Sequence, residues 1–263
     1  MKYKFIIIIL IILIIFYLSN QYLYNNFKEH FNNESNISNM IDYYVINMDK
    51  DKERWKYYAL WNKNHSEINI QRFPGIYGKD VDRDKLIKNG ELSNDNKILD
   101  GQLGCALSHI ELWKHSLKSD KPYLLVLEDD AILPDDLSKK IEELEEYLPK
   151  KWDIVFLGGC NIYGKKYNEK MIIPTRYDKR YNLCLHAVLI NKKCIPKLLK
   201  IMTPMNIPID NQIRDNYKIL DVYYHNPNLI NQNKDLLSER RIIDGLPQSE
   251  YWKKNHTNMF IDQ

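Results

Sequence analysis

Three adjacent carboxylic acids end an apolar run near the middle of the chain. The segment YLLVLEDDAIL, residues 123–133, places Glu128, Asp129 and Asp130 directly after the run. Neighbouring carboxylates repel one another, so together they favour a strongly positive partner. Hard oxygen ligands suit Mg²⁺ or Mn²⁺, whose coordination is usually completed by substrate phosphates. These residues therefore raise the hypothesis of a metal-bound diphosphate.

The apolar run that precedes the acids is typical of a buried strand. Ligands of parallel sheets bind in the crevice at the carboxyl ends of the strands, which is where this strand delivers its acids. Side chains alternate along a strand, so Glu128 and Asp130 would face one side and Asp129 the other. At least two carboxylates can then converge on one ligand.

Other interpretations of the three acids stay open. They could cap a helix that starts near Pro134, because Asp is a preferred capping residue. A Walker B strand also ends in acids, but GIYGKD at residues 75–80 has neither the spacing nor the hydroxyl of a P-loop. An aspartyl-phosphate nucleophile is chemically possible, yet the sequence offers none of its usual companions.

Apolar periodicity predicts strands that alternate with helices over the globular part. This alternation is typical of an α/β fold with a mainly parallel central sheet. Residues 160–181 carry many charges and few apolar side chains, so we expect a surface loop there. The expected strands cover residues 42–48, 68–73, the apolar run from 123, 153–157, 183–190 and 219–224; the expected helices lie within 49–64, 82–88, 102–117, 134–148, 192–202 and 211–217.

The N-terminus contains an uninterrupted apolar segment, FIIIILIILIIFYL, at residues 5–18. A membrane-spanning helix needs about 20 residues, and continuing this one to residue 24 supplies that length. No small-x-small cleavage site follows, so we expect an uncleaved transmembrane signal anchor at residues 5–24. A cleaved signal peptide is the alternative.

The charge distribution around this segment predicts its orientation. Lys2 and Lys4 precede it, so residues 1–4 should form a cytoplasmic tail and the rest should lie in the lumen or outside the cell, as in a single-pass type II protein. Residues 25–40 are polar and rich in Asn and Ser, as expected of a stem. The globular domain would then occupy residues 41–263.

Composition excludes one class and leaves the cysteines open. The formal net charge is only +3 and the basic residues are interleaved with acids, which argues against a nucleic-acid partner. Cys105, Cys160, Cys184 and Cys194 lack the spacing of a metal site. A lumenal domain permits disulfides, although the apolar surroundings of Cys105 and Cys184 favour buried free thiols.

Several ordered segments together resemble glycosyltransferase family 25, which includes lipopolysaccharide glycosyltransferases and procollagen galactosyltransferases. GQLGCALSHIELW at residues 101–113, followed by YLLVLEDDAIL, is similar to the core signature of that family. One departure is Gln102, where the family commonly has an acid. Further similar segments are VINMDKDKERW (45–55), RFPGIYGKD (72–80), KWDIVFLGG (151–159), IPIDNQI (207–213) and PNLINQ (227–232).

The resemblance implies a GT-A type fold that holds a nucleotide-sugar donor through a divalent metal, Mn²⁺ or Mg²⁺. Asp130 then stands as a metal ligand, assisted by Glu128 or Asp129 through the metal, a water or the ribose. A late histidine supplies a further ligand in many such enzymes, and His225 in YYHNP matches that position. A structural role is the alternative for His225.

The resemblance also implies roles in catalysis and donor binding. Inverting transfer needs a general base, for which Asp210 in the P-x-D segment is the candidate, with N-capping of helix 211–217 as the alternative. Asn47 and Arg54 would meet the base and phosphates of the donor. Ser108 and His109, on the signature helix, are assigned to the donor site as well. Cys105 and Trp113 on the same helix are interpreted as packing.

These assignments predict a membrane-anchored transferase that moves galactose or glucose from a UDP-sugar to a hydroxyl. The acceptor would be hydroxylysine on a collagen-like chain or a glycan. A catalytically inactive relative that binds a glycan or a protein partner is the second interpretation. Retention of both the acids at 128–130 and the P-x-D segment favours activity.

Overall fold

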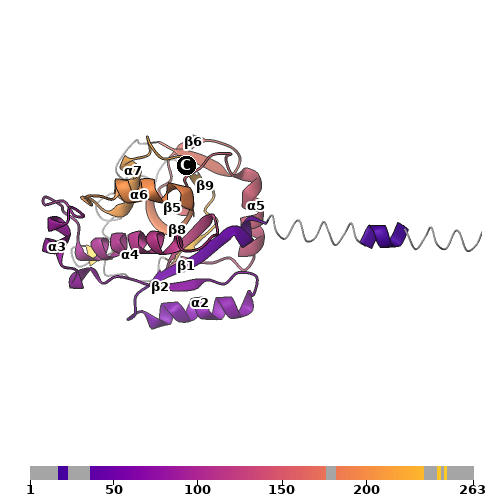
Figure 1. The fold of residues 1–263 in the computed structure, drawn as a ribbon, viewed down its shortest axis with the longest axis horizontal. Coiled ribbons are helices and arrows are strands. Elements are labelled where there is room, and N and C mark those ends of the chain that lie inside the picture. The colour runs from indigo at the N-terminus through magenta and orange to yellow at the C-terminus, as the bar shows by residue number, and fades with distance from the viewer. Residues whose placement is uncertain (1–16, 23–35, 176–181, 234–241, 244–245, 248–263) are drawn as a thin grey trace, which may run out of the picture. The chain divides into compact units, whose positions relative to one another are not determined.

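The computed structural model describes residues 17–22, 36–175, 182–233, 242–243 and 246–247 (Figure 1). The chain divides into two units, residues 1–40 and 41–263. In the first unit, residues 17–22 are helical and the 3₁₀ helix η1 spans Ile37–Met40.

The predicted anchor at residues 5–24 and the predicted stem at residues 25–40 lie mostly outside the described residues. Within the part that is described, no helix is long and apolar enough to cross a membrane.

The second unit is built on an eight-stranded sheet with the order β2-β1-β3-β8-β5-β9-β7-β6. β2, β1, β3, β5 and β9 run in one direction, and β8 is inserted antiparallel between β3 and β5. The predicted α/β fold with a mainly parallel central sheet is therefore confirmed. The strands are β1 (Ile41–Asn47), β2 (Gln71–Pro74), β3 (Tyr123–Glu128), β5 (Ile154–Cys160), β6 (Gly164–Lys166), β7 (Met171–Pro174), β8 (Leu183–Asn191) and β9 (Val222–His225).

Helices connect the strands of this sheet. The helices are α2 (Lys52–Asn64), η2 (Gly78–Asp80), α3 (Arg83–Lys88), α4 (Asp100–Ser116), α5 (Leu137–Tyr147), η3 (Lys192–Cys194), α6 (Ile195–Ile201) and α7 (Ile209–Asp215). Two small sheets pair β4 (Ala131–Ile132) with β10 (Asn231–Gln232) and β11 (Ile242–Ile243) with β12 (Leu246–Pro247).

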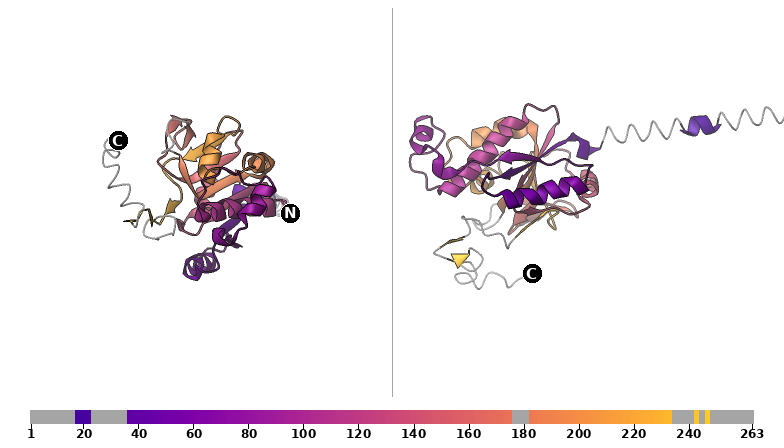
Figure 2. Two further views of the ribbon diagram at one scale, coloured as in Figure 1. Left: turned by 90° about the vertical axis from the view of Figure 1, so that its left-hand side faces the viewer. Right: turned by 90° about the horizontal axis from the view of Figure 1, so that it is seen from below.

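The main core lies between one face of the sheet and the helices α4, α6 and α7. Leu124 and Val126 of β3 point into this core, and Trp113 of α4 is 1% exposed within it. The apolar residues at helical spacing in α4 therefore form the buried face of that helix. α2 runs on the other side of β1 and β2 from α4 (Figures 1 and 2). This arrangement leaves the ends of β1 and β3 accessible between α2 and α4.

The predicted surface loop at residues 160–181 is wrong in part. β6 and β7 form an antiparallel hairpin there, and β7 pairs with β9 to extend the sheet. β7 is apolar (MIIP) but only four residues long, so the many charges around it hid its signal. β6 (GKK) lies at the sheet edge, where a strand can form with polar side chains because it faces solvent.

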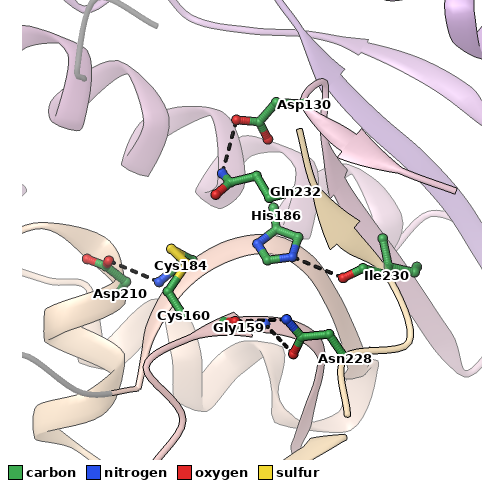
Figure 3. The surroundings of a disulfide bond; sticks show 9 residues. All are labelled: Asp130, Gly159, Cys160, Cys184, His186, Asp210, Asn228, Ile230 and Gln232. Atoms are coloured by element: carbon green, nitrogen blue, oxygen red, sulfur yellow. Dashed lines mark hydrogen bonds between the residues drawn. A yellow bond between two sulfur atoms is a disulfide. The ribbon is translucent and has the colours of Figure 1, made fainter. Parts of the chain in front are cut away.

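The prediction of a free thiol at Cys184 is also wrong, because Cys184 forms a disulfide with Cys160 (Figure 3). β5 continues two glycines beyond its apolar run, and its last residue, Cys160, then pairs with Leu183 at the start of β8. The two Cα atoms lie 5.6 Å apart, the usual separation for a bridged pair.

Candidate active site

The acids of the opening motif lie where the ends of two parallel strands meet. Glu128 ends β3 and is in register with Ile46, so Asn47 at the end of β1 lies beside the turn formed by Asp129 and Asp130. The hydroxyl of buried Tyr58 on α2 lies 3.0 Å from the backbone oxygens of Glu128 and Ala131. This contact fixes the turn against α2.

Asp129 has its positive partner within the protein. Arg54 Nη1 donates to Asp129 Oδ1 at 2.7 Å, and Asn47 Nδ2 donates to Asp129 Oδ2 at 2.7 Å. Burial alone would lower the pKa of Arg54, but its hydrogen bond to Asp129 and the charges of the nearby acids outweigh burial and raise it. One of the three adjacent acids is therefore neutralised by α2, which helps the others to coexist.

Capping of a helix does not explain these acids. α5 begins at Leu137, and its N-cap position is Asp136 rather than any residue of the motif. The three side chains instead point to three different parts of the domain.

Asn47 and Ser108 lie close to the predicted site, but the side chains of both form hydrogen bonds with other residues of the domain. Asn47 is 1% exposed, and its Oδ1 accepts from Arg72 Nε at 2.8 Å while its amide holds Asp129. Ser108 Oγ accepts from Ile76 N at 2.8 Å and donates to Gly104 O at 2.6 Å. These bonds position Asp129 and the loop at residues 76–79.

A cleft of about 350 Å³ opens at this end of the sheet, and a volume of that size suits a small-molecule ligand. Arg54, Lys50 and Lys79 line it, and the two lysine ammonium groups lie 4.8 and 6.0 Å from the centre of the Tyr77 ring. Four acids, Asp51, Asp100, Glu128 and Asp129, also line the cleft. Cations and carboxylates in one cleft fit an anionic ligand that brings its own divalent ion. The other lining residues are Ile46, Met48, Asp51, Ile76, Tyr77, Gly78, Asp100, Gly101, Cys105, Ser108, His109, Glu128 and Asp129.

One wall of the cleft rests on contact between two backbones. A Cβ atom on Gly104 of α4 would lie 2.5 Å from Ile76 O, and one on Gly78 would lie 1.7 Å from Asp100 O. Only glycine permits this approach. Gly104 therefore sets the position of the loop at residues 76–79 against α4.

Glu128 points toward α4. Cys105 Sγ donates to Glu128 Oε1 at 3.3 Å, and His109 Nε2 lies 3.5 Å from the same oxygen. Cys105 and His109 are four residues apart on α4, so they share one face of that helix. The interpretation of Cys105 as packing missed this contact.

Asp130 is held by the small β4–β10 sheet. Gln232 Nε2 donates to Asp130 Oδ2 at 3.0 Å, and the carboxylate is 7% exposed (Figure 3). Asp130 lines a second cleft of about 240 Å³ together with Tyr57 and Ile132. Because Asp129 and Arg54 line both clefts, this ion pair forms the wall between them.

Asp210 lies in the first turn of α7, beside the disulfide (Figure 3). α7 begins at Ile209 with Pro208 as its cap, so the alternative of an N-cap role for Asp210 is not met. Its carboxylate accepts from Asn211 N at 2.8 Å and from Cys184 N at 3.4 Å. Burial chiefly raises the pKa of Asp210, and the charge of Glu128 adds to this rise.

His225 does not join the acids. Its Nδ1 lies 2.6 Å from Pro227 O, and β9 is separated from β3 by β8 and β5. At about 4.8 Å between neighbouring strands, roughly 14 Å divides them. The expected convergence fails because the chain order of the strands differs from their order in the sheet.

The profile described as "Glycosyltransferase family 25 (LPS biosynthesis protein)" matches residues 40–213. The chain belongs to this family.

Similar proteins carry names from the same family. A glycosyltransferase 25 family member of Aedes aegypti is 23% identical over 65% of this chain and 30% of its own length. Procollagen galactosyltransferase 2 of Mus musculus is 24% identical over 47% of the chain and 21% of its own length. Inactive glycosyltransferase 25 family member 3 of Mus musculus is 34% identical over 22% of this chain and 10% of its own length. The chain spans less than a third of the length of these relatives.

Three of the segments that carry the family 25 resemblance meet around the first cleft. Lys50 and Arg54 come from the first segment, Tyr77 and Lys79 from the second, and Glu128 from the third. Sequence reasoning missed Lys50, Lys79, Cys105 and Gln232. The PNLINQ segment did contain Gln232, but only the pairing of β10 with β4 shows that its amide holds Asp130.

Proposed function

We propose that this family 25 chain is a GT-A type inverting glycosyltransferase that moves galactose or glucose from a UDP-sugar to a hydroxyl acceptor. The observation that carries the proposal is the first cleft, where Arg54, Lys50 and Lys79 lie beside Glu128 and Asp129, while Asp130 lines the neighbouring cleft. Arg54, Lys50 and Lys79 would attract the diphosphate of the donor. Tyr77 would offer a ring face to the uracil base.

The Asp130 carboxylate fits Mn²⁺ or Mg²⁺, because it offers hard oxygen atoms. Among the described residues Asp130 belongs to no group of three protein ligands, so the diphosphate and water would complete the coordination. The bound ion would supply Lewis-acid neutralisation of the charge on the departing diphosphate.

Asp210 would accept the proton of the attacking hydroxyl. Its raised pKa makes it a stronger base than an ordinary Asp. The backbone N–H groups of Asn211 and Cys184 would hold one orientation of the carboxylate.

The names of similar proteins and the disulfide bear on the acceptor and the compartment. One relative is named for procollagen galactosyl transfer and the family description names lipopolysaccharide biosynthesis, so we propose a collagen-type hydroxylysine or a glycan. The disulfide supports an oxidising compartment, as expected for a type II protein anchored by residues 5–24.

The proposal is tested by incubating the full chain with Mn²⁺ and a panel of UDP-sugars while measuring UDP release with and without acceptors. We expect one UDP-hexose to be turned over in the presence of Mn²⁺ or Mg²⁺ and not after chelation. The similarity to an inactive member makes an inactive binding protein the second candidate. UDP binding without turnover of any donor would favour it and overturn the transferase.

A further inference from the structure

The strongest unassigned feature is a sulfur, nitrogen and oxygen cluster on the floor of the first cleft. Its members are Cys105 and His109 of α4 and Glu128 of β3, and their ligand atoms all lie within 4.8 Å of one another. All three residues line the cleft. Thiolate, imidazole and carboxylate together suit a borderline ion such as Zn²⁺ rather than Mn²⁺ or Mg²⁺.

The spacing of the cluster fits a tetrahedral ion. Zinc bonds of about 2.3 Å to sulfur and about 2.0–2.2 Å to nitrogen or oxygen place neighbouring ligands roughly 3.3–3.7 Å apart. Glu128 Oε1 lies 3.3 Å from Cys105 Sγ and 3.5 Å from His109 Nε2. These separations are already close to two edges of a tetrahedron.

A second observation concerns His109 itself. The side chain is 1% exposed, yet its Nε2 makes no hydrogen bond within the described residues and points toward Glu128. Leaving a buried ring nitrogen without such a bond costs free energy. A cation held between His109 and its two neighbours would satisfy it.

The other cluster of similar composition cannot serve in this way. Cys160, Cys184 and His186 also lie close together, but the two sulfurs are joined in the disulfide. The remaining free cysteine, Cys194, is buried and donates to Asp153 O at 3.3 Å. Burial raises its pKa to about 12, which disfavours the thiolate that a metal requires.

We propose that Cys105, His109 and Glu128 form a three-ligand site for Zn²⁺, with the fourth position open to the cleft. Binding would release the thiol proton of Cys105 to solvent. Three protein ligands and one open position would let the ion accept a water or an oxygen of a ligand in the cleft. The site is tested by ion binding alone, so its failure would leave the transferase proposal intact.

Co²⁺ is a suitable probe because it replaces Zn²⁺ and absorbs strongly when bound to a thiolate. Metal ions are first removed from the full chain with a chelator, under conditions that keep the Cys160–Cys184 disulfide intact. The protein is then titrated with Co²⁺ and afterwards with Zn²⁺. We expect the protein to bind about one equivalent of Co²⁺ and to show a thiolate-to-metal charge-transfer band. Zn²⁺ should displace the Co²⁺ and remove the band. Cys105→Ser should abolish the band and weaken Zn²⁺ binding at least tenfold. Cys194→Ser, the matched control, should retain both.

A measurement on the unaltered protein guards against misfolding of the variants. Zn²⁺ should slow alkylation of Cys105 at least tenfold, read by mass spectrometry of the peptide, whereas Mg²⁺ should not. His109→Gln should remove this protection while leaving the thiol in place. Absence of the charge-transfer band, its survival in Cys105→Ser, or alkylation that is indifferent to Zn²⁺ would overturn the site.

Discussion

Each of the three acids has a different surrounding, and this difference defines its role. Asp129 is paired with Arg54, Asp130 is held by Gln232, and Glu128 faces Cys105 and His109. Of these three acids, Glu128 and Asp129 border the first cleft. The motif is therefore one ion-paired structural acid flanked by two acids that are available to ligands.

Arg54→Met should destabilise the domain by about 1–3 kcal/mol, because it leaves Asp129 as a largely buried charge between two other acids. The side chains of the pair are 18% and 11% exposed. Urea unfolding measures the loss. The matched control is Lys56→Met on the same helix, whose pair with Glu53 is 70% and 82% exposed and should cost less than about 0.5 kcal/mol.

A double variant separates charge from packing in that pair. Arg54→Met combined with Asp129→Asn removes both charges, so it should recover most of the lost free energy of unfolding. If the double variant is less stable than Arg54→Met alone, the loss arises from packing and the ion pair is unimportant.

Asp210→Asn should remove most transfer activity, by at least a hundredfold in kcat, while UDP binding stays within about twofold. Asp215→Asn, later in the same helix, is the control and should be nearly neutral. Initial rates and UDP titration measure the two effects. Equal losses of binding and turnover would point to a structural role for Asp210.

The same carboxylate predicts a pH dependence. Its pKa is raised by burial, so the ionised base appears only above this raised value. The rate should therefore fall as pH decreases through a pKa higher than that of an ordinary Asp. The linked stability has the opposite trend: a raised folded-state pKa contributes stability at low pH that is lost as pH rises through it. A rate profile that falls only near the ordinary Asp value would contradict this.

At the level of elements, the site depends on how closely α4 approaches the loop at residues 76–79. Gly104 and Gly78 let the two backbones touch, and Ser108 ties them together. The position of Lys79 and of its neighbours in the cleft therefore depends on glycines that have no side chain to contact a ligand.

Gly104→Ala should test this contact. The added methyl would meet the backbone oxygen of Ile76 at 2.5 Å, so we expect a loss of about 1–3 kcal/mol and weaker UDP binding. Gly101→Ala, at an exposed position in the first turn of α4, is a control for stability alone because Gly101 also lines the cleft; it should be neutral or stabilising because Ala favours helices. Thermal unfolding and UDP titration distinguish the two. Equal stability of both variants would show that the loop at residues 76–79 moves to accommodate the methyl group without loss of free energy of unfolding.

At the level of the whole domain, local patterns predicted the elements but not how distant elements meet. The apolar run before Glu128 and the helical spacing of α4 predicted β3 and α4 because both bury a continuous face. The antiparallel insertion of β8 left no local signal, since strand direction depends on the connections. The position of His225 illustrates this: it ends β9, and strands β8 and β5 lie between β9 and β3 in the sheet.

The disulfide also depends on long-range pairing, and it gives a prediction for the domain as a whole. It joins residues 24 apart in sequence and places Cys184 N against the Asp210 carboxylate. Replacing both Cys160 and Cys184 with Ser should lower the free energy of unfolding by about 2–4 kcal/mol, because the unfolded chain regains freedom.

The same double replacement should lower kcat more than it changes KM for the donor. Cys184, whose backbone N–H contacts Asp210, would no longer be fixed by the disulfide, whereas the first cleft would stay intact. Cys194→Ser controls for loss of a buried thiol and should leave kcat unchanged. Steady-state kinetics on the full chain at a temperature where both variants are folded measures the effect. A double variant that is less stable but has unchanged kcat would show that the disulfide supports the fold without positioning Asp210.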